Sequence, residues 1–137
     1  MNTRTFALLF GLVFLAVGIL GFVPGMTYMP AMGTHDVTMT KGYGDLLGLF
    51  PVNVLHNGVH ILFGLWGLLA YRSLSGAKTY FKAVAVIYAL LTVMGLVPSL
   101  NTTFGFIPIY GNDVWLHAVL ALVAAYFGWM NRDPVGA

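Results

Sequence analysis

Four long apolar runs dominate the sequence and limit what it can fold into. They cover residues 5–23, 52–71, 80–97 and 113–130. A helix of about 20 residues, rising 1.5 Å per residue, crosses the roughly 30 Å hydrocarbon layer of a bilayer. A membrane β-barrel would instead need alternating segments of about ten residues, which this sequence lacks. The runs therefore predict an all-α fold, an integral membrane four-helix bundle with a long loop at residues 24–51.

The composition fits the same class of protein and excludes several others. Hydrophobic residues make up 59% of the 137 residues and charged residues only 7%, whereas soluble domains carry about a quarter charged residues. The net charge of +2 is too small for a nucleic-acid-binding surface. Because the chain has no Cys, disulfides and thiolate chemistry are excluded. We expect a single domain, residues 1–137, that contacts the lipid bilayer and no nucleic acid.

The basic residues predict the orientation in the membrane. Five of the six lie near the N-terminus, around the connection between the second and third runs, or after the fourth run: Arg4, Arg72, Lys78, Lys82 and Arg132. Only Lys41 lies in the 24–51 loop, and residues 99–112 contain no basic residue. Since Lys and Arg favour the cytoplasmic side, both termini are expected in the cytoplasm and the two longer loops outside.

A weak internal repeat relates the two halves of the chain. Residues 21–24 (GFVP) end the first run and residues 95–98 (GLVP) end the third, while residues 48–52 (GLFPV) and 105–109 (GFIPI) precede the second and fourth runs. Matched signatures at matched positions predict two helical hairpins in pseudo-repeat, related by an axis along the membrane normal.

Polar residues are concentrated at the outer ends of the second and fourth runs. Those of the second run fall at helical spacings of three and four: Asn53, His56, Asn57 and His60. In the fourth run, Asp113 and His117 are four residues apart, and Trp115 lies between them. Ionisable residues within spans are costly, usually face the bundle interior and often mark a functional site. These residues are therefore the candidate site.

Three interpretations of this site remain open. The polar groups can simply hold the helices together by hydrogen bonds. Alternatively, His56 and His60 can share a transition-metal ion with His117 or Asp113, or His56 and His117 can ligate a haem or chlorophyll, with Asp113 orienting a ligand. The third interpretation is a proton relay or a small-ligand pocket, which Trp115 would line.

A weaker candidate metal site lies in the 24–51 loop. Met26, Met29, Met32 and His35 follow one another at a spacing of three. Thioethers are soft ligands that suit Cu(I), although Met also packs adaptably where a loop covers a bundle.

Enzyme chemistry is not favoured, because the chain has no Glu and Asp113 is the one acid near the histidines. We expect a non-catalytic accessory or binding subunit that associates with other membrane subunits or with itself. The alternatives are a haem-, chlorophyll- or metal-binding redox or light-harvesting-type subunit using His56, His60 and His117, and a small carrier of metal ions or protons.

Two motifs resemble those of a known family. Residues 49–60 (LFPVNVLHNGVH) and 111–117 (GNDVWLH) are similar to a bacterial family of small four-span membrane proteins, catalogued as domain of unknown function 4383. The resemblance extends from the first run to the fourth. It implies four spans in a bacterial inner membrane and supplies no activity or cofactor.

Overall fold

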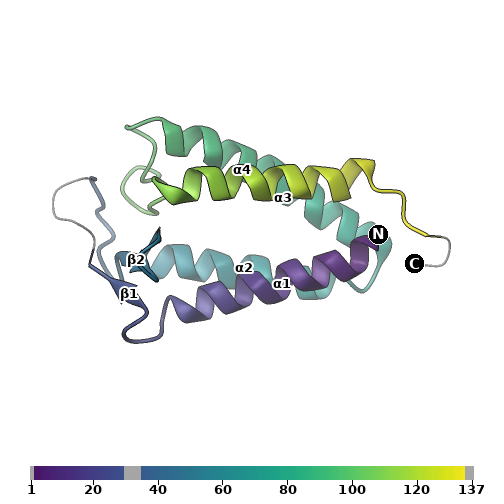
Figure 1. Cartoon of the computed structure of the whole chain (residues 1–137), viewed down its shortest axis with the longest axis horizontal. Coiled ribbons are helices and arrows are strands. Elements are labelled where there is room, and N and C mark those ends of the chain that lie inside the picture. The colour runs from purple at the N-terminus through teal and green to yellow at the C-terminus, as the bar shows by residue number, and fades with distance from the viewer. Residues whose placement is uncertain (1, 30–34, 135–137) are drawn as a thin grey trace.

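The computed structural model describes residues 2–29 and 35–134 and confirms the all-α prediction. The helices are α1 (Thr3–Leu20), α2 (Val54–Ala70), α3 (Leu74–Leu96) and α4 (Asn112–Ala125), and α4 continues into the π-helical turn η1 (Tyr126–Met130). Figure 1 shows two long hairpins, α1 with α2 and α3 with α4, lying side by side with the N-terminus and the C-terminal segment at one end.

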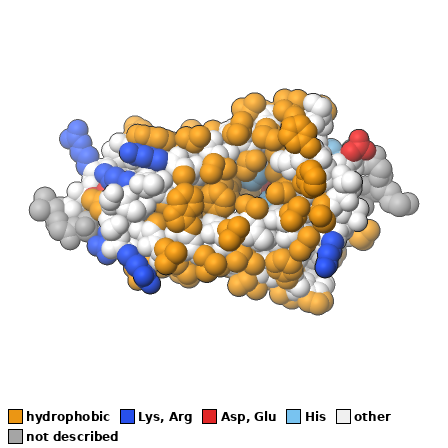
Figure 2. Space-filling view, turned by 180° about the vertical axis from the view of Figure 1, so that it is seen from behind, with side chains coloured by type: hydrophobic (Ala, Val, Ile, Leu, Met, Phe, Trp, Pro, Cys, Tyr) orange, Lys and Arg blue, Asp and Glu red, His pale blue; other side chains and the backbone are white. Residues whose placement is uncertain are grey.

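Three helical segments in the described residues are long and apolar enough to cross a membrane: Thr3–Leu20, Leu74–Leu96 and Asn112–Met130. α2 is a shorter apolar helix of 17 residues. In Figure 2, hydrophobic side chains cover the middle of the face shown, and Lys and Arg gather mainly at one end. This surface suits lipid contact, since exposing apolar side chains to acyl chains carries no free-energy penalty.

Helix α3 begins at Leu74, six residues before the apolar run that predicted it. The Ser73 hydroxyl accepts a hydrogen bond from the Gly76 N–H at 3.0 Å and so caps the helix. The apolar runs placed residues 74–79 outside the predicted helix, because this segment includes Lys78 and several small or polar residues. A local cap starts the helix regardless of hydropathy.

Glycines bring α1 and α2 close together. A Cβ added at Gly67 would lie 2.7 Å from the Cα atom of Gly11, and a Cβ at Gly64 would lie 2.7 Å from the Leu15 nitrogen. Small residues at such crossings let two helix backbones touch, which in lipid supplies most of the packing energy.

We call the half of the bundle nearer the termini the inner half, and the end that carries the loops at residues 24–51 and 97–111 the outer end. Aromatic rings join the two hairpins in the inner half. Phe10 of α1 and Phe81 of α3 meet edge to face, with ring centroids 5.1 Å apart. Phe6 stacks on Phe127 of η1 at 4.2 Å. These contacts are those expected of aromatic pairs, and they fix the hairpins against each other below the polar site.

The 24–51 loop contains a small antiparallel sheet that the sequence analysis did not predict. Its strands are β1 (Thr27–Tyr28), β2 (Gly44–Leu46) and β3 (Phe50–Val52), in the order β1-β2-β3. Leu46 pairs with Thr27 on one side and with Phe50 on the other. Because β3 ends one residue before the N-cap of α2, the sheet leads directly into the polar site.

A second polar network, which we call the inner clasp, joins Thr3, Lys78, Asn131 and Asp133. The Thr3 N–H and hydroxyl donate to the Asp133 carboxylate at 2.6 and 2.9 Å, and the Asn131 amide donates to the Thr3 hydroxyl oxygen at 2.9 Å. The Lys78 ammonium lies 3.6 Å from Asp133. Burial raises the pKa of Asp133, but these donors outweigh burial and hold it below its ordinary value. The clasp ties both chain ends to α3.

Candidate functional site

Asn53 connects the start of α2 to both outer loops. Its side chain is fully buried. The Oδ1 atom accepts a hydrogen bond from the His56 N–H at 2.9 Å, which caps α2. The Nδ2 group donates to the carbonyls of Met39 at 3.0 Å and Phe106 at 2.7 Å. One amide therefore caps the helix and holds each loop over the bundle.

His56, Asp113 and His117 converge beneath these loops, and we call them the His/Asp cluster. One ligand-type atom from each residue lies within 4.8 Å of the other two. All three side chains are buried, with 4%, 3% and 2% of their surface exposed. His56 Nε2 and Asp113 Oδ2 lie 3.8 Å apart. The cluster therefore joins α2 of one hairpin to α4 of the other.

Only some polar atoms of the cluster have hydrogen-bond partners. His56 Nδ1 lies 3.0 Å from the Pro51 carbonyl oxygen, and since a carbonyl can only accept, Nδ1 is the donor. The Pro108 carbonyl is a second backbone hydrogen-bond partner of the same ring. Within the described residues, neither Asp113 Oδ2 nor His117 Nδ1 has a hydrogen-bond partner. Three side chains of metal-ligand type therefore meet at one buried point, and two of their polar atoms are left without a hydrogen bond there.

His60 lies outside this group. Its ring stacks on that of His56, with centroids 4.7 Å apart, and its Nδ1 donates to the His56 carbonyl oxygen at 3.1 Å. The structure brings Asp113, rather than His60, together with His56 and His117. The spacing of four along α2 placed His60 correctly on the same helical face, one turn deeper.

The remaining predicted site residues lie around the cluster. Asn57 packs against α1, where a Cβ at Gly21 would overlap its carboxamide, and neither polar atom of that carboxamide has a partner in the described chain. Trp115 is 54% exposed, and its indole N–H donates to the Asn112 side chain at 3.2 Å. Trp115 is therefore at the surface and does not line the cluster.

The space beside the histidines is too small for a tetrapyrrole. A cavity of about 160 Å³, lined by His56, His60, Tyr88 and His117 among others, adjoins the cluster. Small-molecule pockets usually have about 300 to 1,000 Å³. The His56 and His117 rings are 6.4 Å apart, and Tyr88 packs edge to face on His117 at 5.0 Å. The predicted haem or chlorophyll ligation does not fit these surroundings.

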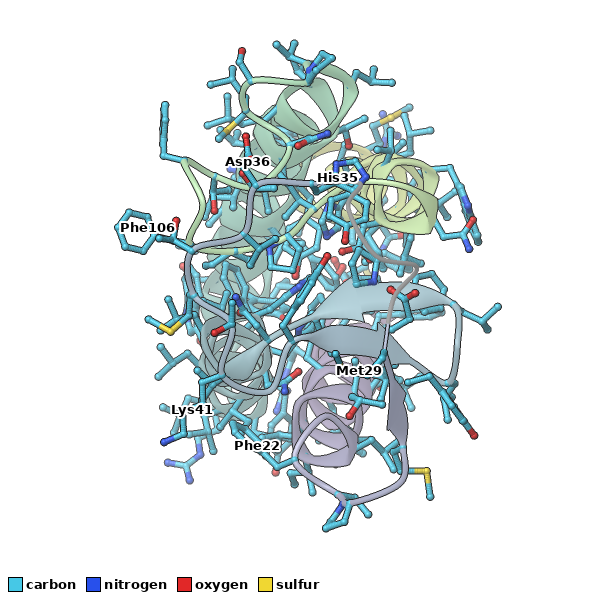
Figure 3. The ribbon with its side chains drawn as sticks, turned by 90° about the vertical axis from the view of Figure 1, so that its left-hand side faces the viewer. Phe22, Met29, His35, Asp36, Lys41 and Phe106 are labelled. Atoms are coloured by element: carbon cyan, nitrogen blue, oxygen red, sulfur yellow. The ribbon has the colours of Figure 1, made fainter. Side chains whose placement is uncertain are left out.

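The described part of the methionine-containing loop does not gather its candidate ligands. Met29 is 85% exposed, and His35 stacks on Tyr110 with ring centroids 3.5 Å apart. Figure 3 shows Met29 and His35 well separated across the outer end. Met26 is half-buried just before β1, and Met32 lies outside the described residues.

Two functional contacts were missed by the sequence analysis. Tyr43 and Tyr110 share a hydrogen bond between their hydroxyls, which links the outer loops in front of α4. Burial, together with Tyr43, raises the pKa of Tyr110. The Pro51 carbonyl, which accepts a hydrogen bond from His56 Nδ1, was also missed, although the repeated proline before each helix was a signal for it.

The fold and the site together define a small helical protein with lipid-compatible helices and a buried His/Asp cluster beneath its outer loops. The chain belongs to the family described as domain of unknown function DUF4383, whose model matches residues 4–130. No curated protein and no solved structure matches the chain. The function must therefore be argued from the site.

Proposed function

We propose that the protein is a non-catalytic membrane protein that binds one divalent transition-metal ion of the Zn²⁺ class at His56, Asp113 and His117. The observation that carries the proposal is the meeting of three buried side chains of metal-ligand type, of which Asp113 Oδ2 and His117 Nδ1 have no hydrogen-bond partner in the described residues. Burying such groups unpaired is costly, and metal coordination is one of the ways in which proteins compensate for it.

The geometry suits the ion with a small adjustment. Bonds of about 2.0–2.2 Å to N and O in a tetrahedral site put ligand atoms about 3.4 Å apart. The ligand atoms of the cluster already lie within 4.8 Å of one another. The bond from His56 Nδ1 to the Pro51 carbonyl is the outer-shell contact that usually orients a ligating histidine.

A bound ion would cross-link the two hairpins. His56 belongs to α2, whereas Asp113 and His117 belong to α4. The carboxylate of Asp113 would be a ligand, and it is the one carboxylate in the cluster as the structure describes it. The cluster therefore lacks the pair of carboxylates that many acid–base mechanisms use, and we propose that its histidines act as metal ligands.

The charge distribution supports a location for the site. Arg4, Arg72, Lys78 and Arg132 lie at the ends of helices on the side of the termini, and Lys41 lies in the opposite loop. In a bacterial inner membrane, this arrangement puts both termini in the cytoplasm and the ion in the outer half of the bilayer. The described segments at the end that carries the termini are short and leave little surface for a soluble partner, so we propose that any partner is another membrane subunit or a second copy.

The test is metal analysis of protein purified in mild detergent, without a histidine tag, followed by titration of chelator-treated protein with Co²⁺. We expect about one ion per chain and a tetrahedral Co²⁺ absorption band. His117→Ala and Asp113→Asn should lose both, whereas His35→Ala, which removes a histidine outside the cluster, should keep both.

Two results would refute the proposal. A folded protein that is metal-free as purified and takes up neither Zn²⁺ nor Co²⁺ would assign the cluster to a shared proton or to packing. A Soret or chlorophyll band lost in His56→Ala would assign it to a tetrapyrrole.

A further inference from the structure

A second cavity lies between α1 and α4. It has a volume of about 360 Å³, and its lining runs along α1 from Phe6 to Val17 and along α4 at Leu116 and Leu120. Leu9 and Val13 line it and are 47% and 59% exposed. We call this cavity the α1–α4 crevice. It opens on the surface that faces acyl chains.

His60 is the one polar residue that lines the α1–α4 crevice. Its Nδ1 donates to the His56 carbonyl, so Nε2 of the neutral ring is an acceptor. No group in the described chain donates a hydrogen bond to that Nε2. The crevice therefore contains one hydrogen-bond acceptor in otherwise apolar, largely aromatic surroundings, and a complementary ligand must supply a donor.

The depth of His60 restricts the kind of donor. His60 lies six residues after Val54, the first residue of α2, which is about 9 Å along the helix axis. A charged phospholipid head group would have to leave water to reach this depth, at a large cost. A hydroxyl can reach it cheaply, because its single donor finds the histidine nitrogen and nothing charged is buried.

We propose that the α1–α4 crevice binds a neutral long-chain lipid with a hydroxyl head group, such as an isoprenoid quinol or a long-chain alcohol. The hydroxyl donates to His60 Nε2, and the chain lies along α1 between Phe6 and Val17, a length of about 16 Å. Phe10 and Phe14 cover one side of the chain and Leu120 the other. This site is separate from the His/Asp cluster and does not require that a metal be bound.

The test compares probes that differ only in the donor. Native mass spectrometry of the purified full-length protein would measure binding of dodecanol against dodecyl methyl ether, and of a decyl-quinol against its decyl-quinone. We expect each hydroxyl probe to bind about tenfold more tightly than its partner, the worth of one hydrogen bond in these surroundings. His60→Phe should remove that preference.

A matched pair of variants tests the place of binding. Leu120→Trp fills the crevice and should abolish binding of every probe. Leu122→Trp changes the same residue type on the same helix, at a position that is 72% exposed and lies outside the crevice, and should leave binding unchanged. Thermal unfolding of both variants shows whether they are folded.

The outcomes separate this proposal from the metal proposal. Equal binding of donor and donor-free probes, unchanged preference in His60→Phe, or no binding of any probe to the wild type would each overturn the lipid site. Metal content measured on the same samples tests only the His/Asp cluster. Quinol binding without alcohol binding, or the reverse, still supports the site and identifies the head group.

Discussion

The Nε2 atom of His56 lies 3.8 Å from the Oδ2 atom of Asp113, and the two residues come from different helical hairpins. This contact brings α2 of one hairpin against α4 of the other in the outer half of the bundle. A cation bound between these atoms would therefore also affect how firmly the two hairpins are held together.

Replacing the carboxylate with its neutral isostere separates the need for a cation from the need for packing. In Asp113→Asn, an amide of the same shape replaces the buried carboxyl group, so the position can no longer carry a negative charge. We expect chelator-treated Asp113→Asn to unfold at a higher temperature than chelator-treated wild type. Its free energy of unfolding should be larger by about 1–3 kcal/mol. Without chelator and with Zn²⁺ present, the order should reverse. If the variant is less stable under both conditions, the carboxylate is satisfied without a cation.

The glycine crossing of α1 and α2 should tolerate no added methyl group. Gly67→Ala puts a Cβ 2.7 Å from the Cα atom of Gly11, so we expect a loss of about 1–3 kcal/mol from overpacking. Gly58→Ala is the matched control on the same helix, because a Cβ there meets nothing within 4 Å. It should stabilise α2 by up to about 1 kcal/mol through helix propensity. Unfolding in mixed micelles measures both, and equal effects would contradict the close crossing.

Asn53 should be the most sensitive polar residue at the outer end. Asn53→Ala removes the α2 cap and leaves the carbonyls of Met39 and Phe106 without their donor. A lost cap costs about 1 kcal/mol, and an unsatisfied buried group costs about 1–3 kcal/mol more. Ser73→Ala removes one exposed cap bond and should cost only the first amount. Limited proteolysis should cleave the 24–51 loop faster in Asn53→Ala than in the wild type, and at the wild-type rate in Ser73→Ala.

The helices and the candidate site could be predicted from sequence to different extents. Apolar runs and a helical spacing of three and four are local properties, and they predicted the bundle and placed His56, Asp113 and His117 at the site. The choice of Asp113 over His60 depends on which turn of α4 lies opposite His56, and that is set by tertiary packing. The sheet escaped prediction because its strands have only two or three residues, and one of them contains Pro51.

The inner clasp should make stability depend on acid pH. The pKa of Asp133 is lower in the folded protein than its ordinary value, so the carboxylate stabilises the fold above about pH 4. This contribution is lost as the pH falls through the folded pKa, where the carboxylate is protonated and its bonds to Thr3 and Lys78 weaken. The midpoint temperature of thermal unfolding should fall more steeply between pH 7 and pH 3 for the wild type than for Asp133→Asn. Because all other ionisable groups are the same in both proteins, the difference between the two curves isolates Asp133, and parallel curves would contradict the prediction.

Orientation is accessible to cysteine labelling because the chain has no native Cys. Ser75 is exposed in the first turn of α3, and Ser99 is exposed at the other end of the same helix, just beyond Leu96. We expect a membrane-impermeant thiol reagent to label Ser99→Cys in intact bacterial spheroplasts and to label Ser75→Cys only after the membrane is disrupted. The reason is that Arg72, Lys78 and Lys82 surround Ser75, and such clusters stay in the cytoplasm. The reverse pattern would move the His/Asp cluster to the cytoplasmic half of the bilayer and expose it to the metal pool of the cell interior instead.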